Sequence, residues 1–160
     1  MKVLQLIDSL HAGGAERVAV NYSNSLASRI ETSFLCSTRE EGMLKTSLSK
    51  DVQYLFLNKK STLDFIAISK LNRFVKSHKI DIVHAHASSF FIATLIKMLN
   101  PKMILIWHDH YGNSEFLSKR PKKIVKFCSL FFNHVFFVNT NLETWAKKHL
   151  HIQSSTFLAN

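Results

Sequence analysis

The sequence predicts an α/β protein with a doubly wound, mainly parallel sheet of the Rossmann type and helices on both faces. Short runs rich in apolar residues alternate along the chain with longer segments of helical periodicity. Several of the short runs are apolar at nearly every position, which is typical of parallel strands buried on both faces. The chain has 160 residues and is 46% hydrophobic, so we expect residues 1–160 to form a single domain with a substantial core.

Seven strands are expected along the chain, and Val, Ile, Leu and Phe are frequent in most of them. They lie at residues 3–7, 32–37, 52–57, 80–85, 103–107, 135–138 and 155–158, the last with the weakest pattern. Ligands of a doubly wound sheet bind beyond the carboxyl ends of its strands. The loops that we expect to hold a site are therefore residues 8–14, 37–43, 86–89, 108–113 and 139–141.

Five helices are expected between these strands, at residues 15–28, 62–78, 88–99, 122–133 and 142–150. In the second of them, six apolar residues are expected on one face: Phe65, Ile66, Ile68, Leu71, Phe74 and Val75. Thr62 is the expected N-cap of this helix. The third helix is expected to end at Asn100, because the residue before a proline disfavours helical geometry.

The formal net charge of +10 is concentrated in two segments. Residues 50–79 hold seven Lys or Arg and two acids, and residues 116–142 hold five Lys or Arg and no acid. Such charge indicates a polyanionic partner. The chain has no helix-turn-helix, zinc-finger or RNA-binding aromatic pattern, so we exclude nucleic acid and favour anionic lipid or phosphate.

The second of these segments combines basic and aromatic residues. Anionic lipid or a lipid-linked phosphate acceptor is the expected partner of its cations, which are Lys119, Arg120, Lys122, Lys123 and Lys126. An ordinary solvated face is the alternative for these cations. For the neighbouring apolar residues, insertion into the lipid surface has as its alternative the core face of a helix. These residues are Ile124, Phe127, Cys128, Phe131 and Phe132.

Cysteine usage and hydropathy indicate a cytoplasmic protein. Cys36 and Cys128 each lie in an apolar stretch, so we expect two buried free thiols and a reducing compartment. The N-terminus has no signal-peptide pattern, and no window approaches about 18 uninterrupted apolar residues. We expect a protein that can contact the inner face of a membrane peripherally without spanning it.

The first strand is followed by a loop with paired glycines, Gly13 and Gly14, directly before a helix. Such glycines let the backbone approach a ligand, and free N–H groups of a first helical turn suit a phosphate or a sugar hydroxyl. A tight turn with positive φ is the alternative. The spacing matches neither the dinucleotide-binding nor the phosphate-binding glycine pattern.

Two histidine pairs end neighbouring strands of the predicted order, His84 with His86 and His108 with His110. Residues i and i+2 of a strand point to the same face, so the two pairs converge if the strands are adjacent. This geometry permits a metal site with Asp8 or Asp109 nearby. The alternatives are a buried His84 with satisfied ring nitrogens and a His108 that contacts a ligand without a metal.

Several stretches together resemble the N-terminal domain of the GT-B glycosyltransferases, specifically glycosyltransferase family 4. They are Gly13-Gly14-Ala15-Glu16-Arg17-Val18, Asp81-Ile82-Val83-His84-Ala85-His86, Ile106-Trp107-His108-Asp109-His110-Tyr111-Gly112, Val138-Asn139-Thr140-Asn141 and Thr156-Phe157-Leu158-Ala159-Asn160. The resemblance implies transfer of a sugar from a nucleotide-sugar donor to a glycan or lipid-linked acceptor, with retention and with no obligatory metal or other cofactor. It further implies a second domain with the nucleotide site and an E-x₇-E motif, which is absent from this chain.

The resemblance also implies roles for individual residues. Gly13, Gly14 and Glu16 correspond to the loop near the donor phosphate and sugar, and His108 to a histidine that contacts the donor sugar. The transition state of such a transfer resembles an oxocarbenium ion with a departing diphosphate, so we expect His108 to orient a sugar hydroxyl. Further substrate contacts are expected from His86, Asp109, Tyr111 and Asn139.

The expected process is the synthesis of bacterial surface polysaccharide on a lipid carrier, and this chain alone is expected to be inactive. The alternative function is a non-catalytic half that binds the acceptor or docks to a membrane and works with a separate partner chain.

Overall fold

The computed structural model describes residues 1–112 and 115–158, and this part of the chain contains one seven-stranded parallel sheet. The strands are β1 (Lys2–Ile7), β2 (Thr32–Ser37), β3 (Val52–Phe56), β4 (Ile82–His86), β5 (Ile104–Asp109), β6 (His134–Phe137) and β7 (Ser155–Phe157). Their order in the sheet is β3-β2-β1-β4-β5-β6-β7. The order reverses between β1 and β4, as in Rossmann-like folds, so the predicted fold class is confirmed.

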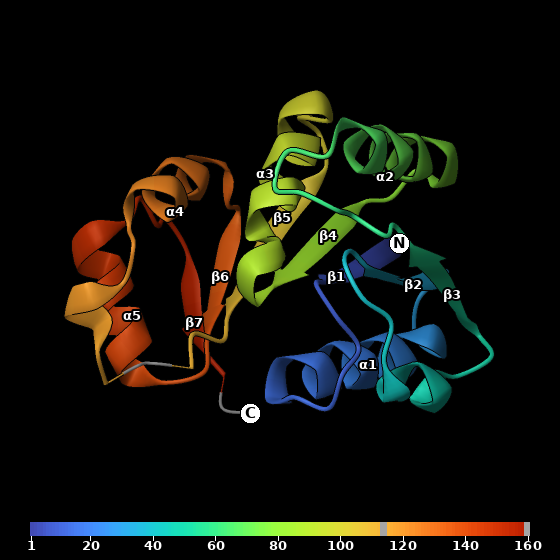
Figure 1. Ribbon diagram of the computed structural model, residues 1–160, viewed down its shortest axis with the longest axis horizontal. Coiled ribbons are helices and arrows are strands. Elements are labelled where there is room, and N and C mark those ends of the chain that lie inside the picture. The colour runs from blue at the N-terminus through green and yellow to red at the C-terminus, as the bar shows by residue number, and fades with distance from the viewer. Residues whose placement is uncertain (113–114, 159–160) are drawn as a thin grey trace.

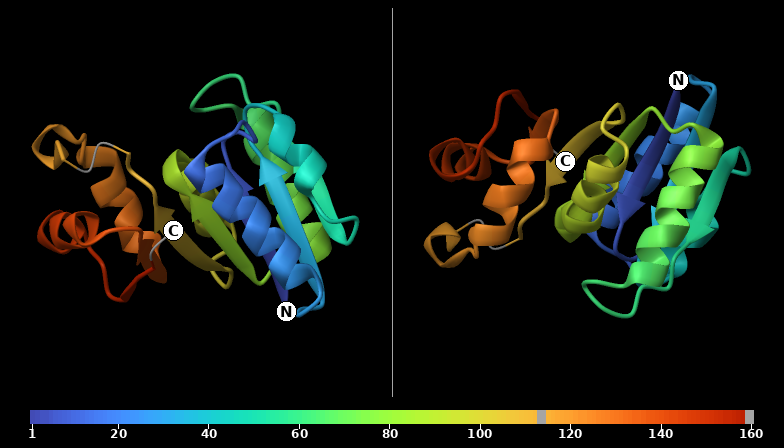
Figure 2. Two further views of the ribbon diagram at one scale, coloured as in Figure 1. Left: turned by 90° about the horizontal axis from the view of Figure 1, so that it is seen from below. Right: turned by 90° about the horizontal axis from the view of Figure 1, so that it is seen from above.

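The helices cover both faces of the sheet (Figures 1 and 2). They are α1 (Gly14–Ala27), α2 (Phe65–His78), α3 (Phe90–Leu99), α4 (Lys123–Cys128) and α5 (Thr140–His149), with short 3-10 turns η1 (Met43–Ser47), η2 (Ala87–Ser89), η3 (Leu117–Lys119) and η4 (Ser129–Phe131). Helix α1 packs on β1 and β2, and α2 and α3 lie on the opposite face. No helix among the described residues is both long and apolar enough to cross a bilayer.

Alternation along the strands assigns side chains to two layers. Leu4, Val83, Leu105 and Val135 pack in the larger core together with α2, α3 and α5. Their strand neighbours face the other way, where Ile7 and Leu35 pack against α1 in a smaller core. Polar residues of β1, β4 and β5 therefore share the face that α1 partly covers.

Helix α2 begins later than expected and exposes part of its predicted apolar face. The N-cap is Asp64 rather than Thr62, because the Asp64 carboxylate accepts the Ala67 N–H at 3.0 Å. The helix then buries Ala67, Leu71 and Val75. Phe65 and Ile66 are 77% and 83% exposed, so the prediction that they lie on the buried face was wrong.

The predicted helix at residues 122–133 is shorter in the structure, where α4 ends at Cys128 and continues as η4. Cys128 and Phe132 are buried, as the alternative core interpretation required. Ile124 and Phe127 are instead 58% and 52% exposed, and Leu130 is 59% exposed. This segment therefore presents an apolar stripe to solvent beside its lysines.

The loop between β2 and β3, for which the sequence predicted no helix, forms η1 and packs on the loop after β1. The contact requires a glycine at position 42, because a Cβ there would lie 2.3 Å from the Leu10 carbonyl carbon. Leu44 donates its N–H to the Leu10 carbonyl oxygen at 3.0 Å. The packing of η1 therefore helps to hold the loop after β1 in place.

Candidate functional site

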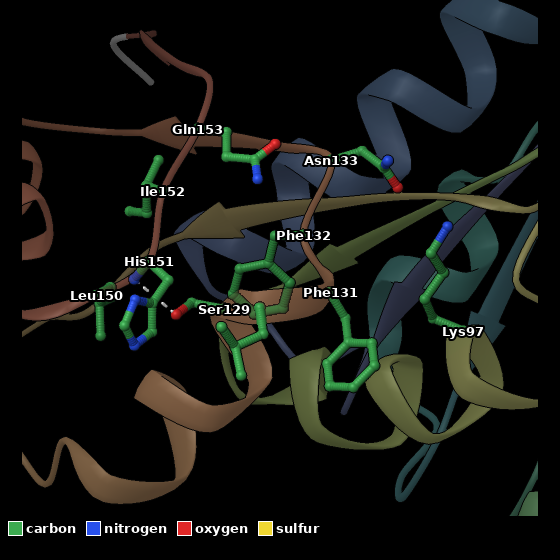
Figure 3. A pocket seen from close by; sticks show the side chains of 10 residues that line it. Lys97, Ser129, Phe131, Phe132, Asn133, Leu150, His151, Ile152 and Gln153 are labelled. Carbon is green, nitrogen blue, oxygen red and sulfur yellow. Dashed lines mark hydrogen bonds between the residues drawn. The ribbon is translucent and has the colours of Figure 1, made fainter.

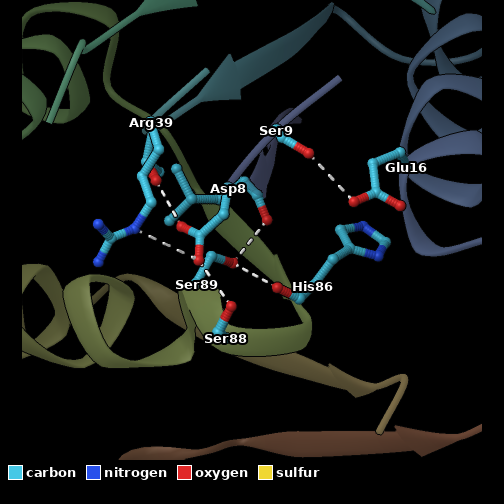
Figure 4. A network of polar contacts seen from close by, with 9 residues as sticks. Asp8, Ser9, Glu16, Arg39, His86, Ser88 and Ser89 are labelled. Carbon is cyan, nitrogen blue, oxygen red and sulfur yellow. Dashed lines mark hydrogen bonds and ion pairs between the residues drawn. The ribbon is translucent and has the colours of Figure 1, made fainter. Parts of the chain in front are cut away.

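The carboxyl ends of the strands gather the polar residues that the sequence singled out. Asp8 follows β1, and its carboxylate accepts hydroxyl hydrogen bonds from Thr38 after β2 and from Ser88 in η2, the latter at 2.6 Å. Ser89 donates its hydroxyl to the backbone oxygens of Leu6 and His86, both at 2.7 Å (Figure 4). These contacts join the ends of β1, β2 and β4 around the point where the strand order reverses.

The two histidine pairs converge, as predicted from the i, i+2 spacing. Strands β4 and β5 are adjacent, and His86 pairs in register with His108. The ring centroids of His84 and His108 are 5.4 Å apart, and the rings are nearly parallel. His110 follows the end of β5, and its ring centroid lies 4.0 Å from that of His108. Four imidazoles therefore share the α1 face of the sheet.

Aromatic residues enclose these imidazoles. Tyr22 of α1 stacks on His84 and His108 at 5.7 and 6.2 Å. The ring centroid of Phe136, on the neighbouring strand β6, lies 5.5 Å from that of His108. His84, His86 and His108 are buried as a result. Tyr22 was not predicted as a site residue, and its position in a helix of ordinary periodicity gave no signal.

One imidazole belongs to a hydrogen-bonded chain. His86 Nε2 lies 2.7 Å from the Gln5 Oε1 acceptor, so this nitrogen carries the proton. His86 Nδ1 is then an acceptor in the neutral ring, and His110 Nε2 lies 3.3 Å from it. Gln5 fixes the tautomer of His86 and thereby orients His110. The sequence did give a signal for Gln5, because it is the one polar residue inside an otherwise apolar run at residues 3–7.

Two other imidazoles have nitrogens without hydrogen-bond partners among the described residues. They are Nε2 of His84 and both ring nitrogens of His108. The expectation that His84 is buried is confirmed, but the expectation that its nitrogens are satisfied is wrong. Buried polar atoms without partners are rare and indicate a ligand, an ion or ordered water.

Burial keeps the whole histidine cluster neutral. It lowers the pKa of His84 to about 3 and that of His108 to about 2, with further lowering from the charge of His110. It lowers the pKa of His110 to about 4 and that of His86 well below its ordinary value. At neutral pH each ring therefore offers one N–H donor and one lone pair.

The cluster has a set of donors that a transition metal could use. Each of His84, His86 and His108 offers one nitrogen, and these nitrogens lie within 4.8 Å of one another. Neutral imidazoles suit zinc and related divalent ions. Of the two carboxylates expected nearby, Asp109 points to the opposite face of the sheet and pairs with Arg120, and Asp8 accepts hydrogen bonds from Thr38 and Ser88. The same nitrogens equally suit hydrogen bonds to sugar hydroxyls.

The glycine loop forms the start of α1. Gly13 is the N-cap with an extended backbone (φ −150°), and no glycine of the described residues has positive φ, so the positive-φ alternative is wrong. The Glu16 side chain folds back over Gly13 and accepts a hydrogen bond from the Ser9 hydroxyl at 3.2 Å. A Cβ at Gly14 would meet nothing within 4 Å. Space therefore remains in front of the first helical turn.

Asp109 and Arg120 form a buried ion pair. From the sequence, they were expected at two different sites, Asp109 at the substrate and Arg120 on the basic surface. Both Arg120 Nη groups donate to the Asp109 carboxylate, at 2.7 and 2.9 Å. The guanidinium also stacks on Tyr111 and Trp145, each at 4.5 Å. The expectation that Arg120 belongs to the exposed basic surface is therefore wrong, because its charge is neutralised inside the protein. Burial raises the pKa of Asp109, and Arg120 opposes that rise.

The remaining predicted residues are placed as follows. Tyr111 covers Arg120 and borders a cavity of about 320 Å³ at the ends of β4 and β5, which Ser88 and Phe90 also line. Asn139 caps α5, where its side-chain oxygen accepts the Leu142 N–H at 2.9 Å. The structure thus gives Asn139 a structural role. Asn113, Ala159 and Asn160, which the sequence placed at a loop and at a domain junction, lie outside the described residues.

The basic surface consists of Lys119, Lys122, Lys123 and Lys126, all of which are exposed. They surround the apolar stripe of Ile124, Phe127 and Leu130 defined above. Lysines beside exposed apolar side chains on a helix are typical of a segment that lies at a lipid surface.

A larger cavity of about 560 Å³ lies elsewhere (Figure 3). It is bordered by Asn133, Gln153 and Lys97, and residues 133 and 153 precede β6 and β7. It therefore opens at the amino ends of the strands, where doubly wound folds do not place their ligands. The carboxyl edge remains the candidate site.

Comparison with protein families matches the chain to Glycosyltransferase Family 4 over residues 12–157. A search of curated proteins finds no match.

Solved structures share the fold. HepE from Anabaena in complex with UDP has a TM-score of 0.73 and 16% identity, and the match covers 100% of this chain and 44% of that one. The lipopolysaccharide outer core galactosyltransferase WaaB has a TM-score of 0.70 and 14% identity, with 100% and 46% covered. A putative UDP-N-acetylglucosamine 2-epimerase from Listeria monocytogenes has a TM-score of 0.62 and 14% identity, with 92% and 42% covered. The chain thus spans less than half the length of these proteins.

Proposed function

Because the chain belongs to glycosyltransferase family 4, we propose that it is the acceptor-side half of a GT-B enzyme that transfers a sugar from a nucleotide-sugar donor. The observation that carries the proposal is that His86 and His108 end the adjacent strands β4 and β5 at the carboxyl edge of the sheet, where the glycine turn after the neighbouring strand β1 begins α1. HepE, whose structure was determined with UDP and with glucose, supports the choice of donor.

The residues of the site have complementary tasks in this reaction. The unpartnered nitrogens of His108 hold a hydroxyl of the donor sugar, since a buried imidazole gains most from a hydrogen-bonding ligand. The open first turn of α1 at Gly14 lies against the donor phosphates, where backbone N–H groups stabilise the charge of the leaving diphosphate. The hydrogen-bonded chain from Gln5 through His86 orients His110 next to His108.

The proposed mechanism uses no metal and no other cofactor, and it retains the configuration at the anomeric carbon. The His84, His86 and His108 cluster serves as a hydrogen-bonding wall of the sugar site. A second domain, which holds the nucleotide, closes the site from the carboxyl edge of the sheet.

The acceptor is a glycan or a lipid-linked sugar, and the process is the synthesis of bacterial surface polysaccharide. WaaB, a lipopolysaccharide outer core galactosyltransferase, supports this choice through the shared fold. The lysines and the apolar stripe of α4 hold the enzyme at the cytoplasmic face of an anionic membrane, where a lipid-linked acceptor is presented. A non-catalytic half that works with a partner chain stays the alternative.

Substitution of His108 in the enzyme that carries both domains tests the proposed function. We expect His108→Ala to lower the turnover of sugar transfer by about a hundredfold or more, because a transition-state hydrogen bond is lost. The matched control is His134→Ala, which removes another imidazole of the same sheet face near the amino end of β6. A folded His108→Ala enzyme with nearly normal turnover would contradict the assignment.

A further inference from the structure

Two cations follow the neighbouring strands β2 and β3 at the carboxyl edge of the sheet. Arg39 follows β2, and its N–H donates to the Asp8 backbone oxygen at 2.8 Å. Lys59 follows β3, and its N–H donates to the Thr38 backbone oxygen at 2.7 Å. Both residues are therefore fixed beside the Asp8 carboxylate, at the ends of β2 and β3.

Lys59 is an unusual lysine, because only 7% of its surface is exposed. Within the described parts of the chain, neither a hydrogen bond nor an ion pair reaches its ammonium group. Burial lowers its pKa, the charge of Arg39 lowers it further, and the charges of Asp8 and Asp64 oppose the change. Lysines are rarely buried to this extent without a counter-ion, since part of the hydration of the ammonium group is lost.

The nearest carboxylate is already occupied by other groups. Asp8 accepts hydroxyl hydrogen bonds from Thr38 and Ser88, and its carboxylate lies 3.9 Å from Arg39 Nε. This contact anchors Arg39 by one edge of its guanidinium, while the outer nitrogens point away from Asp8 (Figure 4). An anchored arginine fork with free outer nitrogens, close to the ammonium of a largely buried lysine, suits the binding of a phosphate.

We propose that Arg39 and Lys59 form a subsite for a phosphate group of the acceptor. The assignment to the acceptor depends on the proposed function, and the binding of phosphate does not. The donor phosphates of that function lie at the first turn of α1. Figure 4 places Glu16 of that turn on the opposite side of Asp8 from the Arg39 guanidinium. A group held by Arg39 and Lys59 is therefore a second anion, so the acceptor is a sugar phosphate or a phosphate-linked lipid.

Titration of this chain with inorganic phosphate, followed by NMR of the backbone amides, tests the subsite. We expect saturable shifts of the signals of Arg39 and Lys59. Arg39→Gln and Lys59→Gln each remove a charge-assisted hydrogen bond and weaken the affinity for phosphate about tenfold. The control is Lys60→Gln, which removes the same charge from the adjacent, exposed residue and keeps the affinity within about twofold.

Three results would overturn the proposal: no saturable shift, equal losses in Lys59→Gln and Lys60→Gln, or binding of UDP at Arg39 and Lys59 more than about tenfold tighter than phosphate. The second result indicates a diffuse basic field, and the third assigns the cations to the donor. Circular dichroism checks the fold of each variant, and Arg39→Gln decides the outcome if Lys59→Gln does not fold. Loss of transfer in His108→Ala is measured independently, so failure of the subsite and failure of the proposed function are distinguishable.

Discussion

The buried pair of Asp109 and Arg120 links the end of β5 to the segment that precedes α4. A guanidinium with two hydrogen bonds to one carboxylate and aromatic rings on either side has little freedom to move. Asp109 directly follows His108, so the pair also fixes the strand end that carries the candidate sugar contact. Its role is structural support of the site from the opposite face of the sheet.

We therefore expect Arg120→Ala to lower the free energy of unfolding by about 3–5 kcal/mol, because it leaves a buried carboxylate without its partner. The measurement is urea unfolding followed by tryptophan fluorescence. Lys119→Ala is the matched control, since this neighbouring lysine is exposed and its removal is expected to change stability by less than about 0.5 kcal/mol. Equal effects of the two substitutions would show that the ion pair does not stabilise the fold.

The histidine cluster makes stability depend on pH. His84 has a pKa of about 3 in the folded protein, well below the ordinary value near 6.5. Between these values the unfolded chain binds the proton and the folded protein does not. The stability that the neutral His84 ring contributes to the folded protein is therefore complete above about pH 6.5. It is lost as the pH falls toward the folded-state pKa of about 3. His86, His108 and His110 shift in the same direction.

Substitution by an uncharged ring isolates this effect. We expect His84→Phe to reduce the slope of unfolding free energy against pH by up to about 1.4 kcal/mol per pH unit between pH 6 and 4. Phenylalanine retains the stacking surface for Tyr22 and Phe136. His151→Phe, at an exposed histidine, is the control and should leave the slope unchanged. If His84→Phe left the slope unchanged, the His84 imidazole would bind its proton as readily in the folded protein as in the unfolded chain.

At the scale of elements, the strands were easier to predict than the helix surfaces. Apolar runs located most of the strands within a few residues, because burial on both faces leaves few polar positions, and the partly exposed β7 had the weakest pattern. The i, i+2 rule then predicted the convergence of His86 and His108. Periodicity did not show which apolar residues of α2 and α4 lack a neighbour, so exposure of Ile66 and Phe127 emerged only from the packing.

Helix α4 gives the protein one face that is both basic and apolar. We expect the chain to sediment with vesicles that contain anionic lipid, and substitution of Lys122, Lys123 and Lys126 by Gln to weaken binding at least about tenfold, since each lysine contributes about 1 kcal/mol near such a surface. The control replaces three exposed lysines elsewhere, Lys50, Lys76 and Lys102, by Gln. Equal, weak binding to neutral and anionic vesicles would remove the membrane from the proposed function.

At the scale of the molecule, contacts between distant segments set the limit of prediction from sequence. The parallel sheet and its carboxyl edge follow from local patterns, and so does the position of the glycine turn. Tyr22, Gly42 and Arg120 could not be assigned in this way, because their roles depend on which loop or helix packs against them. Arg120 was placed on a surface because its neighbours are lysines, yet its partner Asp109 lies inside the protein.

The candidate site lies at one edge of this domain, so we expect the chain alone to be inactive. In the proposed function, this chain supplies the first turn of α1 to the leaving diphosphate, and the nucleotide is held by a second domain. Chromatographic detection of product should therefore show no transfer above the His108→Ala background when this chain is mixed with donor and acceptor. The enzyme with a second, nucleotide-binding domain should transfer at least about a thousandfold faster, because orientation of both substrates supplies much of the rate. Transfer by this chain alone at a comparable rate would place the complete catalytic site within one domain and contradict the two-domain proposal.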